Sequence, residues 1–292
     1  MKHAVLIMAH NNWEVVKCLL HQLDIPEFDI FLHVNAKVSD FPQTELKHCL
    51  EHAKFQLVPR VKVGYCDYTM VEAVMSLFRT AFQSYHDYYH LISGADLLAT
   101  TRKEFLAFFE QNNGTEFVGF SPTYSRERIF YRNYFVAWGR QASPFRSKVF
   151  MKLRKWLISS QRILGLEKQF SPEWTPRKGT DWYSITHNAV RYILEKETEF
   201  RKHFYHSFCP TEFLPHTILG NNPVFKEKLY CPDADESIQC IRTIDWQRGQ
   251  PYVFRLADFE SIINSPGMFA RKFDEHIDMA IVDRLCEYVI TH

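Results

Sequence analysis

The chain has 292 residues, of which 46% are hydrophobic and 24% are charged, with a formal net charge of +1. This composition is too apolar for a disordered chain, and the small net charge gives no global field that would favour nucleic acid or an anionic membrane. No apolar run approaches 18 residues, so no membrane-spanning helix is expected. The seven cysteines are scattered and form no Cys-x-x-Cys pair, which predicts reduced thiols in a cytoplasmic protein.

The first 120 residues alternate between apolar, strand-like stretches and segments with helical spacing. This alternation predicts a Rossmann-like α/β half with a parallel sheet. The first turn, His10-Asn11-Asn12, lacks a Gly-x-Gly-x-x-Gly pattern, which disfavours a classical dinucleotide site, and Asn12 is the predicted N-cap of the next helix. The expected strands are 3–9, 29–34, 55–58, 88–96 and 117–120, and the expected helices are 13–23, 41–54, 70–85 and 102–112.

The stretch from Tyr88 to Asp96 predicts the central strand of this sheet. An apolar run, His90 to Ile92, ends in small residues and then in the carboxylate of Asp96. Because ligands of open α/β sheets lie outside the carboxyl ends of the strands, Asp96 is a candidate binding residue. One carboxylate is poor provision for a divalent cation, so no metal is expected, and Lys and Arg would have to meet the charge of a bound nucleotide diphosphate.

Residues 121–180 differ in composition from the first 120 residues, because they are rich in basic and aromatic side chains. Such a mixture suits sugars as well as nucleic acid, and ligand contact is favoured for the stretch from Arg126 to Tyr134. The basic segment 146–155 is either a solvated helix face or a site of peripheral membrane contact. The basic and aromatic residues are Tyr124, Arg126, Arg128, Tyr131, Arg132, Tyr134, Trp138 and Arg140, and helices are expected near 145–160, 183–197, 211–219, 256–264 and 275–290.

Three short segments of the second half of the chain carry candidate functional groups. Cys209-Pro210-Thr211-Glu212 is typical of a helix start, in which Glu212 favours the helix dipole or serves a function of its own. Met268 to Asp274 places Arg271 and Lys272 in an apolar segment, as a snorkelling pair or as an anion clamp. Asp233-Ala234-Asp235 has the Asp-x-Asp pattern with which many nucleotide-sugar transferases hold a metal, but its late polar setting favours a solvated turn.

Taken in order, these segments resemble the core-2/I-branching β-1,6-N-acetylglucosaminyltransferases and their peptide O-xylosyltransferase relatives, glycosyltransferase family 14. The family typically has Ser-Pro-Asp-Glu where this chain has Cys-Pro-Thr-Glu, and it usually has Asp at the position of Asn35 and Trp at the position of Tyr65. The ordered set of motifs is specific, although no single motif is. The matching segments are Ala4–Leu23, His33–Lys37, Val63–Tyr65, His90–Asp96, Cys209–Glu212 and Phe269–Asp274.

The resemblance implies a GT-A-like fold and an inverting transfer that uses no metal. Glu212 matches the family's catalytic base, and Lys272 matches one of two cations on the donor diphosphate. Arg248 fits the second cation after a one-residue gap, with Arg255 as the alternative. Further residues are implied to bind the UDP-sugar, namely His10, Asn11, Asn35, Lys37 and Asp96. Candidates for contacts with the acceptor or the donor sugar are Arg128, Trp182 and Tyr183.

We therefore expect one domain over residues 1–292, with a nucleotide-sugar-binding half at 1–120 and a helical, loop-rich, acceptor-binding and catalytic half at 121–292. The expected protein is a cytoplasmic, bacterial-type transferase of polysaccharide or glycoconjugate synthesis. It would move N-acetylglucosamine from UDP to a hydroxyl of a glycan acceptor, with no cofactor and no nucleic-acid partner. UDP-xylose is the alternative donor. A catalytically inactive module that binds glycans or nucleotides is the alternative of another class.

Overall fold

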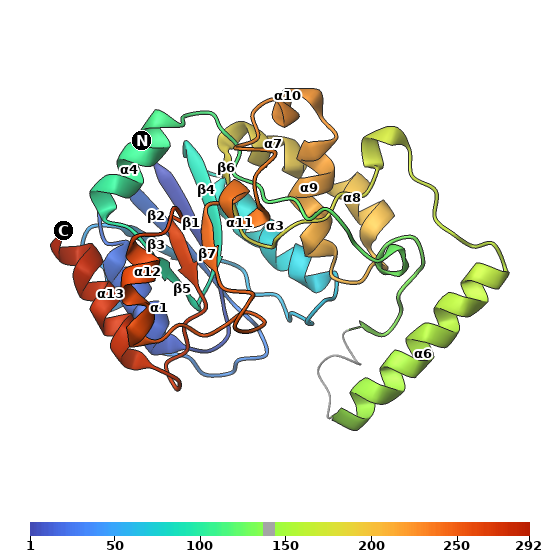
Figure 1. The fold of residues 1–292 in the computed structure, drawn as a ribbon, viewed down its shortest axis with the longest axis horizontal. Coiled ribbons are helices and arrows are strands. Elements are labelled where there is room, and N and C mark those ends of the chain that lie inside the picture. The colour runs from blue at the N-terminus through green and yellow to red at the C-terminus, as the bar shows by residue number, and fades with distance from the viewer. Residues whose placement is uncertain (137–143) are drawn as a thin grey trace.

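The structure is a computed structural model that describes residues 1–136 and 144–292 (Figure 1). Its centre is a five-stranded sheet of order β3-β2-β1-β4-β6, in which β6 alone runs antiparallel to its neighbour. A second, three-stranded sheet has the order β5-β8-β7. The predicted α/β fold with a mostly parallel sheet is confirmed. The strands are β1 (His3–Ala9), β2 (Phe28–Val34), β3 (Lys54–Leu57), β4 (Tyr88–Ser93), β5 (Asp96–Leu98), β6 (Tyr183–Thr186), β7 (Arg242–Ile244) and β8 (Phe269–Arg271).

Helices cover both faces of the five-stranded sheet (Figure 1), which is why its inner strands are nearly continuous apolar runs. One apolar core joins the sheet to α1, α4, α12 and α13, and a second core joins it to α3, α7, α8 and α9. The described helices are α1 (Trp13–Gln22), α2 (Gln43–His48), α3 (Thr69–Ala81), α4 (Arg102–Gln111), α6 (Pro144–Ile163), α7 (His187–Glu195), α8 (Glu197–Phe204), α9 (Leu214–Gly220), α10 (Pro223–Lys226), α11 (Glu236–Gln239), α12 (Phe259–Ile263) and α13 (Met279–Thr291).

Two predictions about the sheet were wrong. The stretch 88–96 was predicted to form the central strand, but the middle strand is β1, and β4 lies beside it. Only one strand, β6, lies on the far side of β4. Residues 117–120 do not form a strand, although Phe117 and Phe120 each make an isolated bridge. The backbone N–H of Phe120 donates to the side chain of Gln239 at 2.7 Å, so this N–H is not available for a hydrogen bond to a neighbouring strand.

The helix predicted for 183–197 begins four residues late, because Tyr183 to Thr186 form β6 against β4. The hydroxyl of Thr186 then accepts the N–H of Ala189 and starts α7. The helix predicted for 41–54 is also shorter, since the carboxylate of Asp24 accepts the N–H groups of residues 51–53 and turns the chain into β3. Asn12 precedes α1 as predicted, but with φ 59° and with no cap bond from its side chain.

Helix α6 stands at the rim of the molecule, away from both sheets (Figure 1). It is attached to the body by one side, where Phe150 is 1% exposed and packs in a small cluster with Cys66 and Cys209. Hydrogen bonds from Arg154 to Asn133 at 2.6 Å and from Gln161 to the backbone of Arg132 add to this attachment. Trp138 and Arg140 of the predicted basic, aromatic stretch lie outside the described residues.

Candidate active site

The candidate site lies at the carboxyl edge of β1 and β4, where the two sheets meet. Gly94 follows β4 and donates its N–H to the carbonyl of Met8 at 2.9 Å. A Cβ at this position would stand 2.9 Å from side-chain atoms of both Ala9 and Val16, so only glycine lets the turn pack this closely against β1 and α1. The close approach leads the chain directly into β5, whose first residue is Asp96.

The carboxylate of Asp96 is committed to the protein itself. It accepts the N–H and the hydroxyl of Ser93, both at 2.8 Å, and its Oδ1 lies 3.2 Å from Nε of Arg271. The pairing of β5 with β8 sets Asp96 opposite Arg271. The side chain of Asp96 is 1% exposed, so its carboxylate faces Ser93 and Arg271 and not the solvent.

Arg271 is thereby directed over the indole ring of Trp182, with its guanidinium carbon 4.4 Å from the ring centroid. Trp182 stands just before β6 and is partly exposed, so an aromatic face and a cation lie together at the site. Tyr183 follows it but is only 1% exposed and packs against Phe78 inside the sheet. The structure therefore brings Trp182, and not Tyr183, to the surface of the site.

Glu212 lies in the short 3-10 helix η3 (Pro210–Phe213), which begins after Cys209 at φ 50°. Its Oε2 accepts a hydrogen bond from Nη2 of Arg128 at 2.7 Å and lies 3.3 Å from Nζ of Lys178. Both contacts use Oε2, and Oε1 has no hydrogen-bond partner among residues 1–136 and 144–292. The side chain is 22% exposed, so one carboxylate oxygen is oriented by two cations while the other can meet a ligand.

A second carboxyl group, that of Asp181, stands beside Glu212 and was not predicted. Burial, and after it the neighbouring carboxylate of Glu212, raise the pKa of Asp181 from 3.8 to about 6. Its Oδ1 is buried, with no hydrogen-bond partner among the described residues. Two carboxyl groups beside each other, of which Asp181 has a raised pKa and feels the charges of Arg271 and Arg128, form a site suited to proton transfer.

A tight crossing of two loops brings Lys178 and Asp181 to Glu212. The N–H of Gly179 donates to the carbonyl of Glu212 at 2.8 Å. A Cβ on Gly179 would lie 1.8 Å from the carbonyl oxygen of Gly119, a distance that no side chain can tolerate. Asp181 and Glu212 are 31 positions apart in the chain, so no local pattern links them. The one signal in the sequence for this part of the site is a glycine, Gly179, next to it.

Lys272 is a cation of this edge that no carboxylate of the described residues neutralises. Among the described residues Arg128 and Lys178 contact Glu212, Arg271 contacts Asp96, and Lys272 has no ion pair. Its charge is felt at the end of β1, since desolvation of the ring and then the charge of Lys272 lower the pKa of His10. An anionic ligand near residues 10 and 272 would supply the missing partner.

The other predicted donor-binding residues follow β1 and β2 at the same edge of the sheet. His10 and Asn11 are exposed at the end of β1. The amide oxygen of Asn35 accepts the N–H of Val63 and of Lys37, each at 3.1 Å, so the side chain of Asn35 ties the end of β2 to the loop before α3. Lys37 is exposed beside it.

Arg248 is exposed, but two carboxylates already hold its guanidinium. It contacts Asp245 at 2.5 Å and Asp258 at 2.7 Å, and it stacks on Tyr252 with its guanidinium carbon 4.1 Å from the ring centroid. The hydrogen bonds that Arg248 donates, to Asp245 first and to Asp258 next, raise its pKa. Arg255, the alternative cation, donates to the backbone carbonyl of Ile277 at 2.9 Å.

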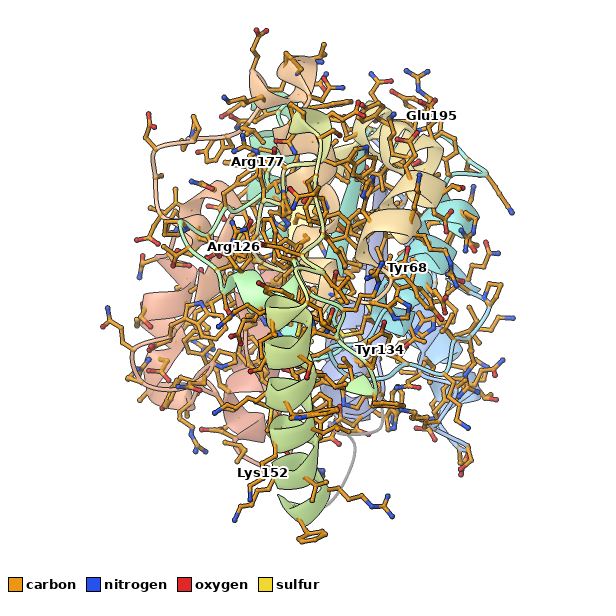
Figure 2. All side chains as sticks on the ribbon, turned by 90° about the vertical axis from the view of Figure 1, so that its right-hand side faces the viewer. Tyr68, Arg126, Tyr134, Lys152, Arg177 and Glu195 are labelled. Atoms are coloured by element: carbon orange, nitrogen blue, oxygen red, sulfur yellow. The ribbon has the colours of Figure 1, made fainter. Side chains whose placement is uncertain are left out.

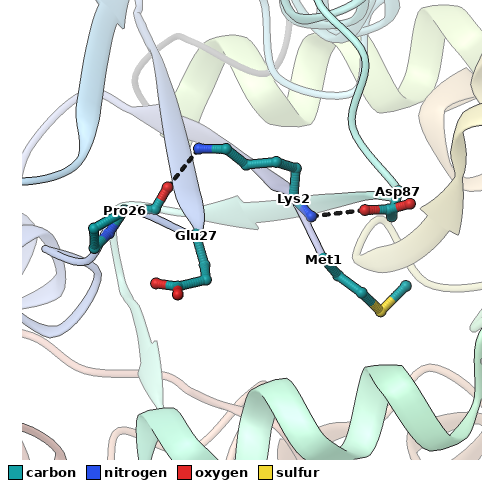
Figure 3. A pocket seen from close by; sticks show the side chains of 5 residues that line it. All are labelled: Met1, Lys2, Pro26, Glu27 and Asp87. Carbon is teal, nitrogen blue, oxygen red and sulfur yellow. Dashed lines mark hydrogen bonds between the residues drawn. The ribbon is translucent and has the colours of Figure 1, made fainter.

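Two further features are a pair of aspartates late in the chain and a surface hollow. Asp233 and Asp235 lie in an exposed turn, where Asp235 caps α11, in agreement with the predicted solvated turn. No cluster of three or more metal-ligating side chains occurs in the described part of the chain. A hollow lined by Met1, Lys2, Pro26, Glu27 and Asp87 (Figure 3) lies at the amino ends of β1, β2 and β4, the opposite edge from the candidate site.

The fold and the site, with a mostly parallel sheet, an oriented carboxylate and cations at its carboxyl edge, agree in class with a glycosyltransferase. Residues 4–261 match the family described as "Branch: Core-2/I-Branching enzyme". The chain belongs to this core-2/I-branching family. The predicted resemblance is thereby confirmed.

Two curated relatives and one solved structure show the range of similarity. Xylosyltransferase 2 of Rattus norvegicus is 23% identical over 214 residues, which span 68% of this chain and only 23% of that protein. The beta-1,3-galactosyl-O-glycosyl-glycoprotein beta-1,6-N-acetylglucosaminyltransferase of Bos taurus is 23% identical over 319 residues, covering 98% of this chain and 69% of that protein. Mouse xyloside xylosyltransferase 1 in its apo form aligns over 92% of this chain and 96% of its own with a TM-score of 0.38 and 10% identity.

No helix in the described part of the chain has both the length and the apolar character needed to cross a bilayer.

Proposed function

We propose that the protein is an inverting, metal-independent transferase that moves a sugar, N-acetylglucosamine in the first instance, from a UDP-sugar to a hydroxyl of a glycan acceptor. The acceptor oxygen attacks the anomeric carbon, the bond from that carbon to the diphosphate breaks, and UDP leaves. Glu212 takes the hydroxyl proton as general base. The carrying observation is the carboxylate of Glu212, which Arg128 and Lys178 hold through Oε2 while Oε1 stays available.

The leaving diphosphate is met by cations in this proposal. Lys272 is the first of them, because it has no ion pair among the described residues and stands near the end of β1. Arg248 is the second, and to bind the diphosphate it would have to exchange part of its contact with Asp245 or Asp258. Fixed cations stabilise the charge that grows on the diphosphate in the transition state, as Mg²⁺ does in other enzymes.

Donor and acceptor are assigned to different groups of residues. His10, Asn11, Asn35 and Lys37 would surround the nucleotide, with Asp96 acting through Arg271. The partly exposed Trp182, under the guanidinium of Arg271, offers a flat apolar face to a sugar ring. Arg128 would act mainly by orienting Glu212, and the buried Tyr183 would anchor β6, the strand that Trp182 precedes.

Metal independence is supported by the state of the carboxylates at the site. Both oxygens of Asp96 accept hydrogen bonds from Ser93. Oε2 of Glu212 is held by two cations, and a divalent ion at Asp96 would be repelled by the positive charge of Arg271, which contacts that carboxylate. Diphosphate recognition by Lys and Arg needs none of these carboxylates as a metal ligand.

The donor sugar is tested by comparing UDP-N-acetylglucosamine with UDP-xylose. The bovine relative that spans 98% of this chain is named for N-acetylglucosaminyl transfer, and the rat relative is named for xylosyl transfer, so these two donors are the ones to compare. Donor hydrolysis, or transfer to a panel of β-galactosides, is followed with and without excess EDTA. The proposal predicts turnover that survives EDTA, with N-acetylglucosamine preferred.

Three results would contradict parts of this proposal. Turnover lost in EDTA and restored by Mn²⁺ would contradict metal independence. A preference for UDP-xylose would change only the donor. Both donors left intact, together with binding of UDP, would favour a non-catalytic module.

The proposed location is the cytoplasm. It is supported by the seven cysteines, which all lie in the described residues and form no disulfide there.

A further inference from the structure

Helix α6 carries an exposed apolar stripe on the side that faces away from the body of the protein. Phe145, Val149, Trp156 and Ile163 are separated by four, seven and seven residues, spacings that place all four on one side of a helix. They are 74%, 40%, 63% and 85% exposed. The stripe is about 27 Å long at 1.5 Å per residue, and it accounts for a large share of the exposed apolar side chains of this region.

The stripe is distinct from the side of α6 that packs on the protein. Phe150 and Ile158, 1% and 2% exposed, point to the body together with Arg154, which donates to Asn133. In Figure 2, which turns this side of the molecule toward the viewer, α6 lies in front of the rest of the protein and Lys152 extends from it into solvent. The apolar stripe therefore has no partner within the described residues and is not part of the core.

Positive charge flanks the stripe, and negative charge is absent from it. Lys148, Lys152 and Lys155 are exposed and form no ion pair with described residues. Residues 144–166 contain six Lys and Arg and no Asp or Glu, although the net charge of the whole chain is only +1. Aromatic and aliphatic side chains beside lysines are the composition of a helix that lies in a bilayer interface, where the stems of the lysines follow the apolar surface and their ammonium groups meet phosphates.

We infer that α6 docks the protein on an anionic lipid bilayer, with the stripe Phe145–Ile163 inserted at the level of the headgroups. Charge complementarity selects this occupant. A second copy of the chain would bring the same basic helix against its own, which like-charge repulsion opposes, whereas anionic lipid matches the three lysines between residues 148 and 155 that stand beside the stripe. The inference goes beyond the transferase activity and does not depend on it.

The test is co-sedimentation of the full chain with phosphatidylcholine vesicles and with vesicles that also contain about 30% phosphatidylglycerol, at low and at high salt. Binding is expected only with the anionic lipid and is expected to weaken with salt. A stripe variant, Phe145→Ser with Trp156→Ser and Ile163→Ser, and a charge variant, Lys148→Glu with Lys152→Glu and Lys155→Glu, should each lose more than about tenfold in partitioning.

A matched control reverses three exposed lysines elsewhere, Lys47→Glu, Lys103→Glu and Lys202→Glu, and should lose much less binding than the charge variant does. Melting temperature and UDP binding should be unchanged in the stripe and charge variants, which separates this inference from the catalytic proposal. Equal binding to neutral vesicles, an equal loss in the control, or no binding at all would overturn the inference. The inference would also be overturned if the wild type did not bind vesicles but formed a concentration-dependent dimer that the stripe variant did not form.

Discussion

The raised pKa of Asp181 makes a quantitative prediction about stability. In the folded protein its pKa is about 6, against 3.8 as the ordinary value, because the carboxyl group is buried beside Glu212. The folded state therefore binds more protons than the unfolded state between about pH 4 and pH 6, and the free energy of unfolding falls as the pH rises through this window. A difference of about two pKa units corresponds to about 3 kcal/mol as an upper bound, and partial solvent access lowers the expectation to about 1–3 kcal/mol.

Asp181→Asn keeps the size of the side chain but removes its ionisation. Relative to the wild type, the variant should gain about 1–3 kcal/mol of unfolding free energy between pH 4 and pH 7, on top of any constant offset from lost contacts with Arg271 and Arg128. Urea unfolding followed by tryptophan fluorescence at four pH values across this range measures the gain. Because the carboxylate of Glu212 is the second cause of the shift, the gain should shrink in a Glu212→Gln background.

Glu116 provides the matched control. It is 1% exposed, it accepts hydrogen bonds from Thr186 far from the site chemistry, and burial raises its pKa to about 7. Glu116→Gln should also flatten the pH dependence, but it should not respond to Glu212→Gln. A difference between Asp181→Asn and wild type that is constant from pH 4 to pH 7 would refute the reasoning, as would a gain that is indifferent to Glu212.

Two further predictions concern the diphosphate clamp and the loop crossing. Lys272→Ala should weaken UDP binding by about 1.5–3 kcal/mol in titration calorimetry. Arg248→Ala should weaken it less, because two carboxylates already hold that side chain, and Arg255→Ala should leave UDP affinity nearly unchanged. A larger loss of affinity at Arg255 than at Arg248 would contradict the assignment. Gly179→Ala should prevent stable folding or lower the melting temperature by more than roughly 10 °C. Gly114→Ala, at φ 86° with open space around it, should lower the free energy of unfolding by only about 1 kcal/mol. Equal effects at the two glycines would show that the loops do not cross as tightly as described.

The sequence was sufficient for the elements that are long or strongly patterned. β1 and α1 are predicted almost to the residue because a run in which six of seven positions are buried and a clear 3.6-residue period leave little choice. β5, β7 and β8 have three residues each, too few to show any period, and they exist because they pair with one another. The stretch Tyr183–Thr186 was assigned to a helix because its strand character comes from pairing with β4.

The candidate site shows the same division. Glu212 and Lys272 stand in segments with a recognisable order of residue types, so they could be predicted as members of a pattern. Their partners could not be predicted in this way, because the contacts Glu212–Lys178 and Asp96–Arg271 join segments 34 and 175 positions apart. Such contacts depend on the crossing of loops at Gly179 and on the register of β5 with β8.

The central claim is that Glu212 is the general base of a sugar transfer, and turnover of Glu212→Gln tests it most directly. The substitution keeps the size of the side chain and an oxygen that can accept from Arg128 and Lys178, but the amide cannot take the proton of the acceptor hydroxyl. Turnover with UDP-N-acetylglucosamine should fall by about 100- to 10,000-fold, while UDP affinity, measured by calorimetry on the same sample, should stay near that of the wild type. Turnover within a few-fold of the wild type, at unchanged UDP affinity, would contradict the account.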